Sequence, residues 1–319
     1  MSELCLVTGG AGFIGSHLVE ALTAAGRPVR ILDDFTTGQP ENLAGVQPAP
    51  EVVEGDLADA AAVDAAVRGA GVVFHLGAIA SVQRGIEEPA RMHAVCATGT
   101  LHVLDAARRH GVRRVVYAAS ASAYGVPVGD VQHEDDPVCP LSTYAAAKLA
   151  GEMYCQAFTA THGLETVRLR FFNIFGPRQR ADSPYSGVIA LFAAAMAAGR
   201  APSVFGDGLQ SRDFTAVADV VQALLLAAEA PASVAGKVYN VGTGRSVSVL
   251  DLVAALNRLL GTNLAAVHTP PRAGDVRHSR ADISRARRDL GYEPSVPFEE
   301  GLARVLHWYG QTPHGERGT

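Results

Sequence analysis

The chain has 319 residues, of which 48% are hydrophobic and 18% charged, and its formal net charge is −5. This length exceeds what one hydrophobic core usually organises, so we expect one large domain with a smaller second region. The acidic balance argues against nucleic acid or an anionic membrane as the main partner.

Short apolar runs alternate with alanine-rich stretches of helical periodicity over the first 170 residues. Strands are predicted at residues 4–7, 29–33, 52–54, 72–76, 115–118 and 166–170. Helices are predicted at residues 16–25, 58–68, 99–110 and 144–162. This alternation indicates right-handed βαβ units and a Rossmann-type, doubly wound parallel sheet, which binds ligands at the carboxyl ends of its strands.

The alternation loosens after residue 171, and residues 238–241 return as a further strand. We therefore predict a smaller C-terminal α/β region that binds the substrate. The Rossmann domain is expected over residues 1–171 and 214–243, and the smaller domain over residues 172–213 and 244–319.

No segment carries the features of a leader or a membrane span. An apolar strand follows Met1-Ser2-Glu3 directly, and the most apolar later stretch, residues 223–230, is too short to cross a bilayer. The four cysteines show no CxxC spacing, which favours reduced structural thiols over a disulfide or a metal site. We expect a cytoplasmic protein without a metal.

The first predicted strand runs into a glycine-rich turn at residues 8–15, Thr-Gly-Gly-Ala-Gly-Phe-Ile-Gly, and then into a helix. Glycine permits the tight turn and lets the backbone approach a pyrophosphate, while the helix N-terminus supplies free N–H groups. A plain turn between strand and helix would also explain glycines, but the strand, the helix and a following acid together predict a dinucleotide site. Contacts to the cofactor are expected from Gly9, Gly12, Phe13, Ile14 and Gly15.

The following acid is Asp33, which closes the second predicted strand 18 residues after Gly15. A carboxylate there accepts hydrogen bonds from the adenosine ribose and repels a 2′-phosphate. No arginine follows it directly, so NAD is predicted rather than NADP; the alternative is that Asp33 only caps a turn. Weaker positional arguments add Asp34, Asp56, Leu57, Leu76 and Ala78 to the cofactor site.

Tyr144 and Lys148 are four residues apart on a predicted helix and therefore share one face. A nearby lysine cation and a positive nicotinamide ring favour the phenolate of a tyrosine, which is otherwise a poor base at neutral pH. Ser120 closes the fifth predicted strand, where its hydroxyl can hydrogen-bond the reacting oxygen. Such a Tyr–Lys pair alone often only decorates a helix surface, but together with the glycine turn and the serine it predicts a catalytic site.

The glycine turn, the strand end Ser120-Ala-Ser122-Ala-Tyr-Gly and the Tyr-x-x-x-Lys helix resemble the extended short-chain dehydrogenases, over almost the whole chain. This resemblance implies NAD as the cofactor and Ser120, Tyr144 and Lys148 as the catalytic triad, with Tyr144 and Lys148 also contacting NAD. It further implies a homodimer formed through helices around residues 99–110 and 145–162.

The residues between the catalytic serine and the Tyr-Gly pair distinguish reactions within this superfamily. The 4,6-dehydratases carry Asp-Glu there and UDP-glucuronate decarboxylases carry Glu, whereas this chain has Ala121 and Ser122, which cannot act as a carboxylic acid–base pair. The chain is therefore most similar to UDP-hexose 4-epimerases. That similarity implies that Tyr144 takes the proton of the sugar 4-hydroxyl while hydride passes to NAD, and that Ser120 stabilises the 4-oxygen of the 4-keto intermediate.

Three segments of the second half resemble the nucleotide-sugar site of this family: residues 171–177, 206–214 and 272–279. Arginine suits a diphosphate because its planar guanidinium donates two hydrogen bonds at once. The resemblance implies substrate contacts from Ser122, Asn173, Arg180, Val188, Arg212, Arg272, Asp275 and Ser279. A role for Arg277 stays open at this point.

Two positions bear on which sugar binds. Ser279 lies where the family has a gatekeeper beside the 2-substituent, and a small residue there leaves room for an N-acetyl group, so we expect UDP-N-acetylglucosamine as well as UDP-glucose. The runner-up is a UDP-glucuronate 4-epimerase, because Arg180 lies in a loop that meets the sugar carboxylate in those enzymes. Those enzymes usually carry Thr where this chain has Asn173, so the asparagine favours a neutral sugar.

One position departs from the family pattern: Cys96 stands where many relatives have an Asn that shapes the cofactor pocket. Other classes also stay open, namely a nucleotide-sugar reductase or dehydratase and an NAD-binding regulator without catalytic activity. The intact Ser120, Tyr144 and Lys148 argue against the regulator.

Overall fold

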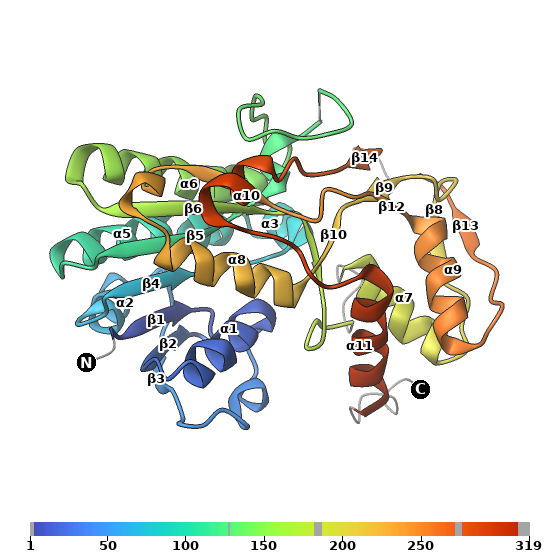
Figure 1. Cartoon of the computed structure of the whole chain (residues 1–319), viewed down its shortest axis with the longest axis horizontal. Helices are drawn as coiled ribbons and strands as arrows, with labels where there is room; N and C mark the ends of the chain where they lie inside the picture. Colours follow the sequence, from blue (N-terminus) through green and yellow to red (C-terminus); the bar gives the residue numbers. More distant parts are fainter. Residues whose placement is uncertain (1–2, 127, 182–186, 272–275, 312–319) are drawn as a thin grey trace.

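The computed structural model describes residues 3–126, 128–181, 187–271 and 276–311. Its centre is a seven-stranded sheet in the order β11-β6-β5-β4-β1-β2-β3 (Figure 1). The strands are β1 (Cys5–Thr8), β2 (Val29–Asp33), β3 (Glu51–Glu54), β4 (Val72–His75), β5 (Arg114–Ser120), β6 (Glu165–Phe171) and β11 (Val238–Val241). All neighbours are parallel, so their carboxyl ends meet at one edge, and the chain order reverses between β1 and β4, where such sheets bind ligands.

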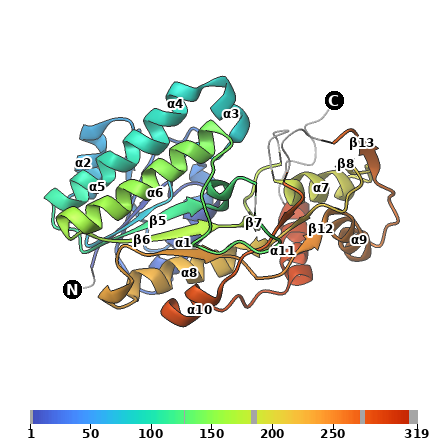
Figure 2. The same cartoon turned by 90° about the horizontal axis from the view of Figure 1, so that it is seen from above.

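Helices cover both faces of this sheet (Figure 2). One face carries α1 (Phe13–Ala24), α8 (Val217–Glu229) and α10 (Ser284–Leu290), and the other carries α2 (Ala60–Val67), α5 (Gly99–Arg109) and α6 (Thr143–His162). Side chains of a strand alternate between the two faces. In β5, for example, Val116 and Ala118 join the core under α1 and α8, whereas Val115 and Tyr117 join the core under α5 and α6.

The connection from β4 to α5 is made of short helical pieces. They are α3 (Val82–Glu87), α4 (Pro89–His93) and a π-helical turn, η2 (Ala94–Thr98). Elsewhere in the described residues lie the 3₁₀ turns η1 (Pro40–Leu43), η3 (Ala121–Tyr124) and η4 (Ala232–Val234). The turn η3 follows β5 directly, and it places the residues after Ser120 at the carboxyl edge of the sheet.

A smaller region packs beside this edge around its own hydrophobic core (Figure 1). Its helices are α7 (Val188–Ala197), α9 (Val249–Leu260) and α11 (Phe298–Gln311). Its short strands are β7 (Asn173–Phe175), β8 (Ser203–Phe205), β9 (Ser211–Arg212), β10 (Phe214–Ala216), β12 (Val247–Ser248), β13 (Val267–Thr269) and β14 (His278–Ser279). These strands pair as β7–β10, β8–β13 and β12–β9–β14.

The predicted fold class is confirmed, with small differences at element ends. Helix α6 begins at Thr143 because Ser142 caps it, accepting a hydrogen bond from the Ala145 amide at 3.1 Å. Strand β5 continues to Ser120 rather than ending at 118. The helices α3 and α4 were not predicted, since six and five residues are too few to show a helical period. The division into two domains at the stated boundaries stays a prediction.

None of the helices in the described part of the chain is both long and apolar enough to cross a membrane. All four cysteines carry free thiols; Cys5, Cys96 and Cys155 are buried and Cys139 is exposed.

Candidate active site

The glycine-rich turn at the end of β1 is packed too closely for side chains. A Cβ on Gly9 would lie 2.9 Å from the Gly77 backbone, and a Cβ on Gly15 would lie 2.0 Å from the Gly9 carbonyl oxygen. Helix α1 begins after Gly12, and no side chain caps its N-terminus. The turn therefore presents bare backbone and uncapped amides at the carboxyl edge, which is what a pyrophosphate needs.

Asp33 lies beside this turn, at the end of β2, and is only 7% exposed. Its carboxylate accepts hydrogen bonds from the amides of Ala11 (2.9 Å) and Phe35 (3.0 Å). Burial raises its pKa, and these two hydrogen bonds offset that only in part. Gly38 closes over the group, since a Cβ there would lie 2.6 Å from Asp33 Oδ1. This is an enclosed acceptor at the position predicted for the adenosine ribose.

The acids Asp34 and Asp56, also predicted for the cofactor site, share an ion-pair partner, Arg91, that was not predicted from the sequence. Arg91 of α4 lies 2.7 Å from Asp56 and 3.7 Å from Asp34. Leu57 is buried, and its side chain limits the space at Gly77. Leu76 and Ala78 follow β4 and pack against the cores on opposite faces of the sheet.

A buried chain of hydrogen bonds joins the ends of β1 and β4 to the start of α5. The Gly77 amide donates to the Thr8 hydroxyl (3.0 Å), which lies 2.7 Å from His75 Nδ1, while His75 Nε2 lies 3.0 Å from the Thr100 hydroxyl. Because Thr100 donates its own proton to the Cys96 carbonyl (2.7 Å), Nε2 must carry the imidazole proton. Burial, with a further contribution from the charge of Lys148, lowers the pKa of His75 to about 3, so this histidine is neutral.

Ser120, Ser122 and Tyr144 come together at the carboxyl edge. The Ser122 hydroxyl donates to Ser120 Oγ at 2.9 Å, and the Ser122 amide does so at 3.2 Å. Burial raises the pKa of Tyr144 to about 12, although a hydrogen bond with Ser120 acts in the opposite direction. The phenol is therefore protonated unless positive charge is brought close to it.

Lys148 lies one turn further along α6 and is 4% exposed. Its ammonium stands 4.3 Å from the centroid of the Tyr117 ring. Burial lowers its pKa.

Cys96, in the π-helical turn, accepts a hydrogen bond from the Ile79 amide (3.3 Å) and donates to Met92 Sδ (3.5 Å).

Three of the residues predicted to bind the substrate, Asn173, Arg212 and Ser279, lie on short strands of the smaller region. Arg212 on β9 and Ser279 on β14 are direct partners in strand register, and the Ser279 hydroxyl lies 3.3 Å from the Gln132 side chain. Asn173 opens β7 and is exposed, and Val188 opens α7. Arg180 is exposed, and Arg272 and Asp275 lie outside the described residues. Arg277 forms a bidentate ion pair with Asp207, with N···O distances of 2.7 and 2.8 Å.

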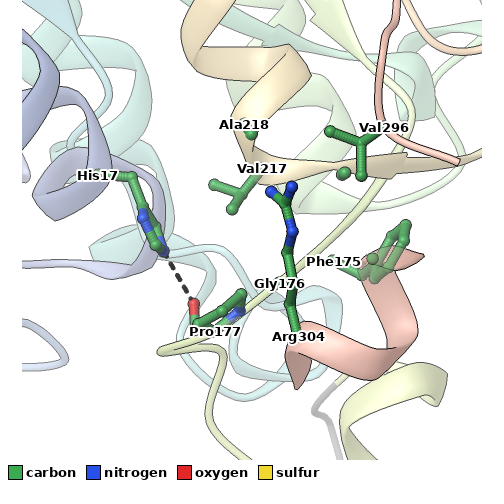
Figure 3. Close-up of a pocket in the computed structure, with 10 residues that line it drawn as sticks. His17, Phe175, Gly176, Pro177, Val217, Ala218, Val296 and Arg304 are labelled. Carbon is green, nitrogen blue, oxygen red and sulfur yellow. Dashed lines mark hydrogen bonds between the residues drawn. The ribbon is translucent and has the colours of Figure 1, made fainter. Parts of the chain in front are cut away.

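The loop that carries Arg180 is anchored on the cofactor side. His17 Nε2 lies 3.0 Å from the Pro177 carbonyl, and Arg178 pairs with Glu20. Figure 3 shows a small pocket at this junction, where Arg304 of α11 extends across it. The residues that line the pocket include no predicted catalytic or cofactor residue, so it is not the site of the reaction.

Comparisons with known proteins identify the family of the chain. The model of the NAD dependent epimerase/dehydratase family matches residues 5–242. The UDP-glucose 4-epimerase of Mycolicibacterium smegmatis is 40% identical over 95% of this chain and 97% of that protein. A dTDP-glucose 4,6-dehydratase of Streptomyces niveus is 35% identical over 95% of this chain and 92% of that protein. The structure of UDP-N-acetylglucosamine 4-epimerase from Methanobrevibacter ruminantium, in complex with UDP-N-acetylmuramic acid, superimposes with a TM-score of 0.92 at 34% identity, covering 97% of this chain and 98% of that one.

Proposed function

This chain belongs to the NAD-dependent epimerase/dehydratase family, and from this premise we propose that it is a UDP-sugar 4-epimerase acting on UDP-N-acetylglucosamine and UDP-glucose. The observation that carries the proposal is the pair of residues after Ser120. Ala121 has no polar side chain, and the Ser122 hydroxyl is committed to Ser120. The described site thus has a base in Tyr144 but, at these two positions, no carboxylic acid–base pair of the kind that dehydration needs.

The residues at the carboxyl edge fit NAD. The bare turn from Gly9 to Gly15 and the uncapped start of α1 would hold the pyrophosphate, Asp33 the adenosine ribose, and Lys148 the nicotinamide ribose. Bound there, NAD would supply the acceptor and donor of the hydride that C4 of the sugar exchanges.

The side chains of the protein handle the proton and the charge. Tyr144 accepts the proton of the sugar 4-hydroxyl and later returns it, while Ser120 donates a hydrogen bond to the 4-oxygen. Ser122 orients the Ser120 hydroxyl. Because burial holds the pKa of Tyr144 near 12, the proton transfer depends on the positive charge of Lys148.

Arg212, Ser279 and Asn173 are proposed to bind the nucleotide sugar, together with Arg272 and Asp275. The register of β9 and β14 supports a shared role for Arg212 and Ser279, because it makes them neighbours. The small Ser279 side chain leaves space for an N-acetyl group. UDP-glucuronate is the second candidate substrate, because Arg180 lies in a loop that resembles the one that meets the sugar carboxylate in UDP-glucuronate 4-epimerases. Dimerisation through α5 and α6 stays a prediction.

The proposal is tested by incubating the purified protein separately with UDP-N-acetylglucosamine, UDP-glucose and UDP-glucuronate, without added cofactor, and reading the C4 configuration by NMR. We expect galacto-configured products from the first two sugars. Conversion of UDP-glucuronate alone would favour the second candidate. If NAD is supplied and none of the three sugars is converted, the epimerase assignment is wrong.

A further inference from the structure

Lys148 is a buried cation that is held by no carboxylate at ion-pair distance among the described residues. Among the ion pairs formed by the described residues, none includes Lys148. The acid one turn further along α6, Glu152, raises the pKa of Lys148 through its charge, but its carboxylate is bound by Arg170 at 2.6 and 3.0 Å and lies 3.9 Å from Arg168. A desolvated ammonium without a counter-group would lose its proton readily.

The other titratable groups that face Lys148 are neutral. Cys96 from the π-helical turn and Cys155 from α6 are buried thiols; burial raises both pKa values, that of Cys155 to about 12. His75 from β4 is neutral for the reason given above, and Tyr144 from α6 is protonated in the absence of a ligand. These four groups therefore supply no negative charge to the lysine.

Tyr117 of β5 contacts both the side-chain ammonium and the backbone carbonyl of Lys148. The face of its ring lies under the ammonium at 4.3 Å, and its hydroxyl donates to the Lys148 carbonyl at 2.9 Å. Tyr117 is fully buried, and burial raises its pKa well above the usual value, so the ring stays neutral. A cation over an aromatic face is stabilised most when water is excluded, as it is here.

The helix is adapted to this contact. A Cβ on Gly151 would lie 2.4 Å from the Tyr117 hydroxyl, so only glycine leaves room for the phenol beside α6. Glycine in a helix interior is otherwise unfavourable. Its presence one turn after Lys148 is explained by the approach of Tyr117.

We propose that Tyr117 is the positioning residue of Lys148: its ring serves as the counter-group that keeps the buried ammonium charged, and its hydroxyl fixes the turn of α6 from which the lysine extends. The catalytic consequence rests on the proposed function, in which the positive charge of Lys148 favours the phenolate of Tyr144. The contact itself does not depend on it.

The composition of the chain offers a direct test, because it contains only two lysines, Lys148 and Lys237. Protein labelled with [ε-¹³C]lysine gives two side-chain signals, and Lys237, which is half-exposed and paired with Asp289, serves as the internal reference. Lys148→Arg assigns the signals. In the unmodified protein, we expect the Lys148 methylene protons to be shifted upfield by the ring current of Tyr117. An unshifted signal would overturn the proposal without any variant of Tyr117.

Two variants separate the ring from the hydroxyl. Tyr117→Phe keeps the ring, so the upfield shift and the pKa of Lys148 should stay within about 0.3 unit of the unmodified protein. Tyr117→Leu removes the ring, so the pKa of Lys148 should fall by about 1 unit or more and the shift should vanish. An unchanged lysine pKa in folded Tyr117→Leu would contradict the proposal.

The pH profile of turnover gives the catalytic readout. Loss of charge on Lys148 raises the pKa of Tyr144, so the rising limb of kcat should move to higher pH in Tyr117→Leu and stay in place in Tyr117→Phe, with KM little changed. If the NMR result is as expected but the protein converts no UDP-sugar, the proposed function fails and the contact stands. If the enzyme is active but the pKa of Lys148 does not change when the Tyr117 ring is removed, the proposed role of Tyr117 fails and the proposed function stands.

Discussion

The cofactor and catalytic side of the site and its substrate side are built differently. On the first side, Asp33 is 7% and Lys148 4% exposed, and His75 has a hydrogen-bond partner at each ring nitrogen. On the second side, Asn173 and Arg212 stand on strands of three and two residues, and Asn173 is exposed. The residues proposed for the chemistry thus lie at a packed sheet edge, whereas those proposed for sugar recognition lie on short, more accessible strands.

This difference indicates which changes each side tolerates. A buried polar group whose partner is removed destabilises the fold, so the catalytic side resists substitution. An exposed side chain on a short strand can change at little cost to stability. We therefore expect substitutions on the first side to abolish turnover or folding, and substitutions on the second side to change which sugar is converted.

The largest effect is expected for Tyr144→Phe, which removes the proton acceptor and leaves the ring. Turnover should fall about 10²–10⁴-fold, with unchanged thermal stability and unchanged NAD content of the purified protein. Progress curves measure the turnover, thermal unfolding measures the stability, and quantification of the extracted cofactor measures the NAD content. Retention of a tenth or more of the activity would exclude Tyr144 as the base.

Gly15→Ala tests the packing of the glycine turn. Its Cβ would lie 2.0 Å from the Gly9 carbonyl oxygen, so we expect a loss of about 1–3 kcal/mol of stability together with loss of bound NAD. Gly45→Ala is the matched control, because a Cβ there meets no atom within 4 Å. Calorimetry should separate the two variants; equal behaviour would show that the turn is not tightly constrained.

Ser279→Tyr addresses the substrate side. A large ring should exclude the N-acetyl group and lower the preference for UDP-N-acetylglucosamine over UDP-glucose by about 10–200-fold in kcat/KM. Stability should hardly change, because Ser279 is only partly buried. An unchanged ratio would remove Ser279 from the specificity site.

Two arginines give the smallest and most discriminating comparison. Arg212→Ala should raise KM for either UDP-sugar about 10–100-fold, since a charged hydrogen bond to phosphate is lost. Arg277→Ala should change KM less than about 3-fold, because its exposed guanidinium is already paired with Asp207. Similar KM changes in both variants would mean that Arg277 also reaches the nucleotide.

The sequence predicted the sheet and the shared face of Tyr144 and Lys148, because strand alternation and helical spacing are local signals. The meeting of Ser120 with Tyr144 was implied by the resemblance to the extended short-chain dehydrogenases. The contacts between Arg91 and Asp56 and between Tyr117 and Lys148 were not predicted. They join residues more than 30 positions apart on different elements, and no periodic pattern marks such a pair. Gly151 was the one available signal, since a glycine inside a predicted helix suggests that another group approaches closely.

Isotope transfer tests the central claim most directly. UDP-[4-²H]N-acetylglucosamine would be converted in the presence of excess unlabelled free NAD, with the product and the free cofactor examined by NMR and mass spectrometry. An epimerase that keeps its cofactor should yield the C4-inverted sugar with deuterium still at C4 and no labelled free NADH. Deuterium in the free cofactor would contradict the account and point to a net oxidoreductase, and a 4-keto product that carries the deuterium at C6 would point to a dehydratase.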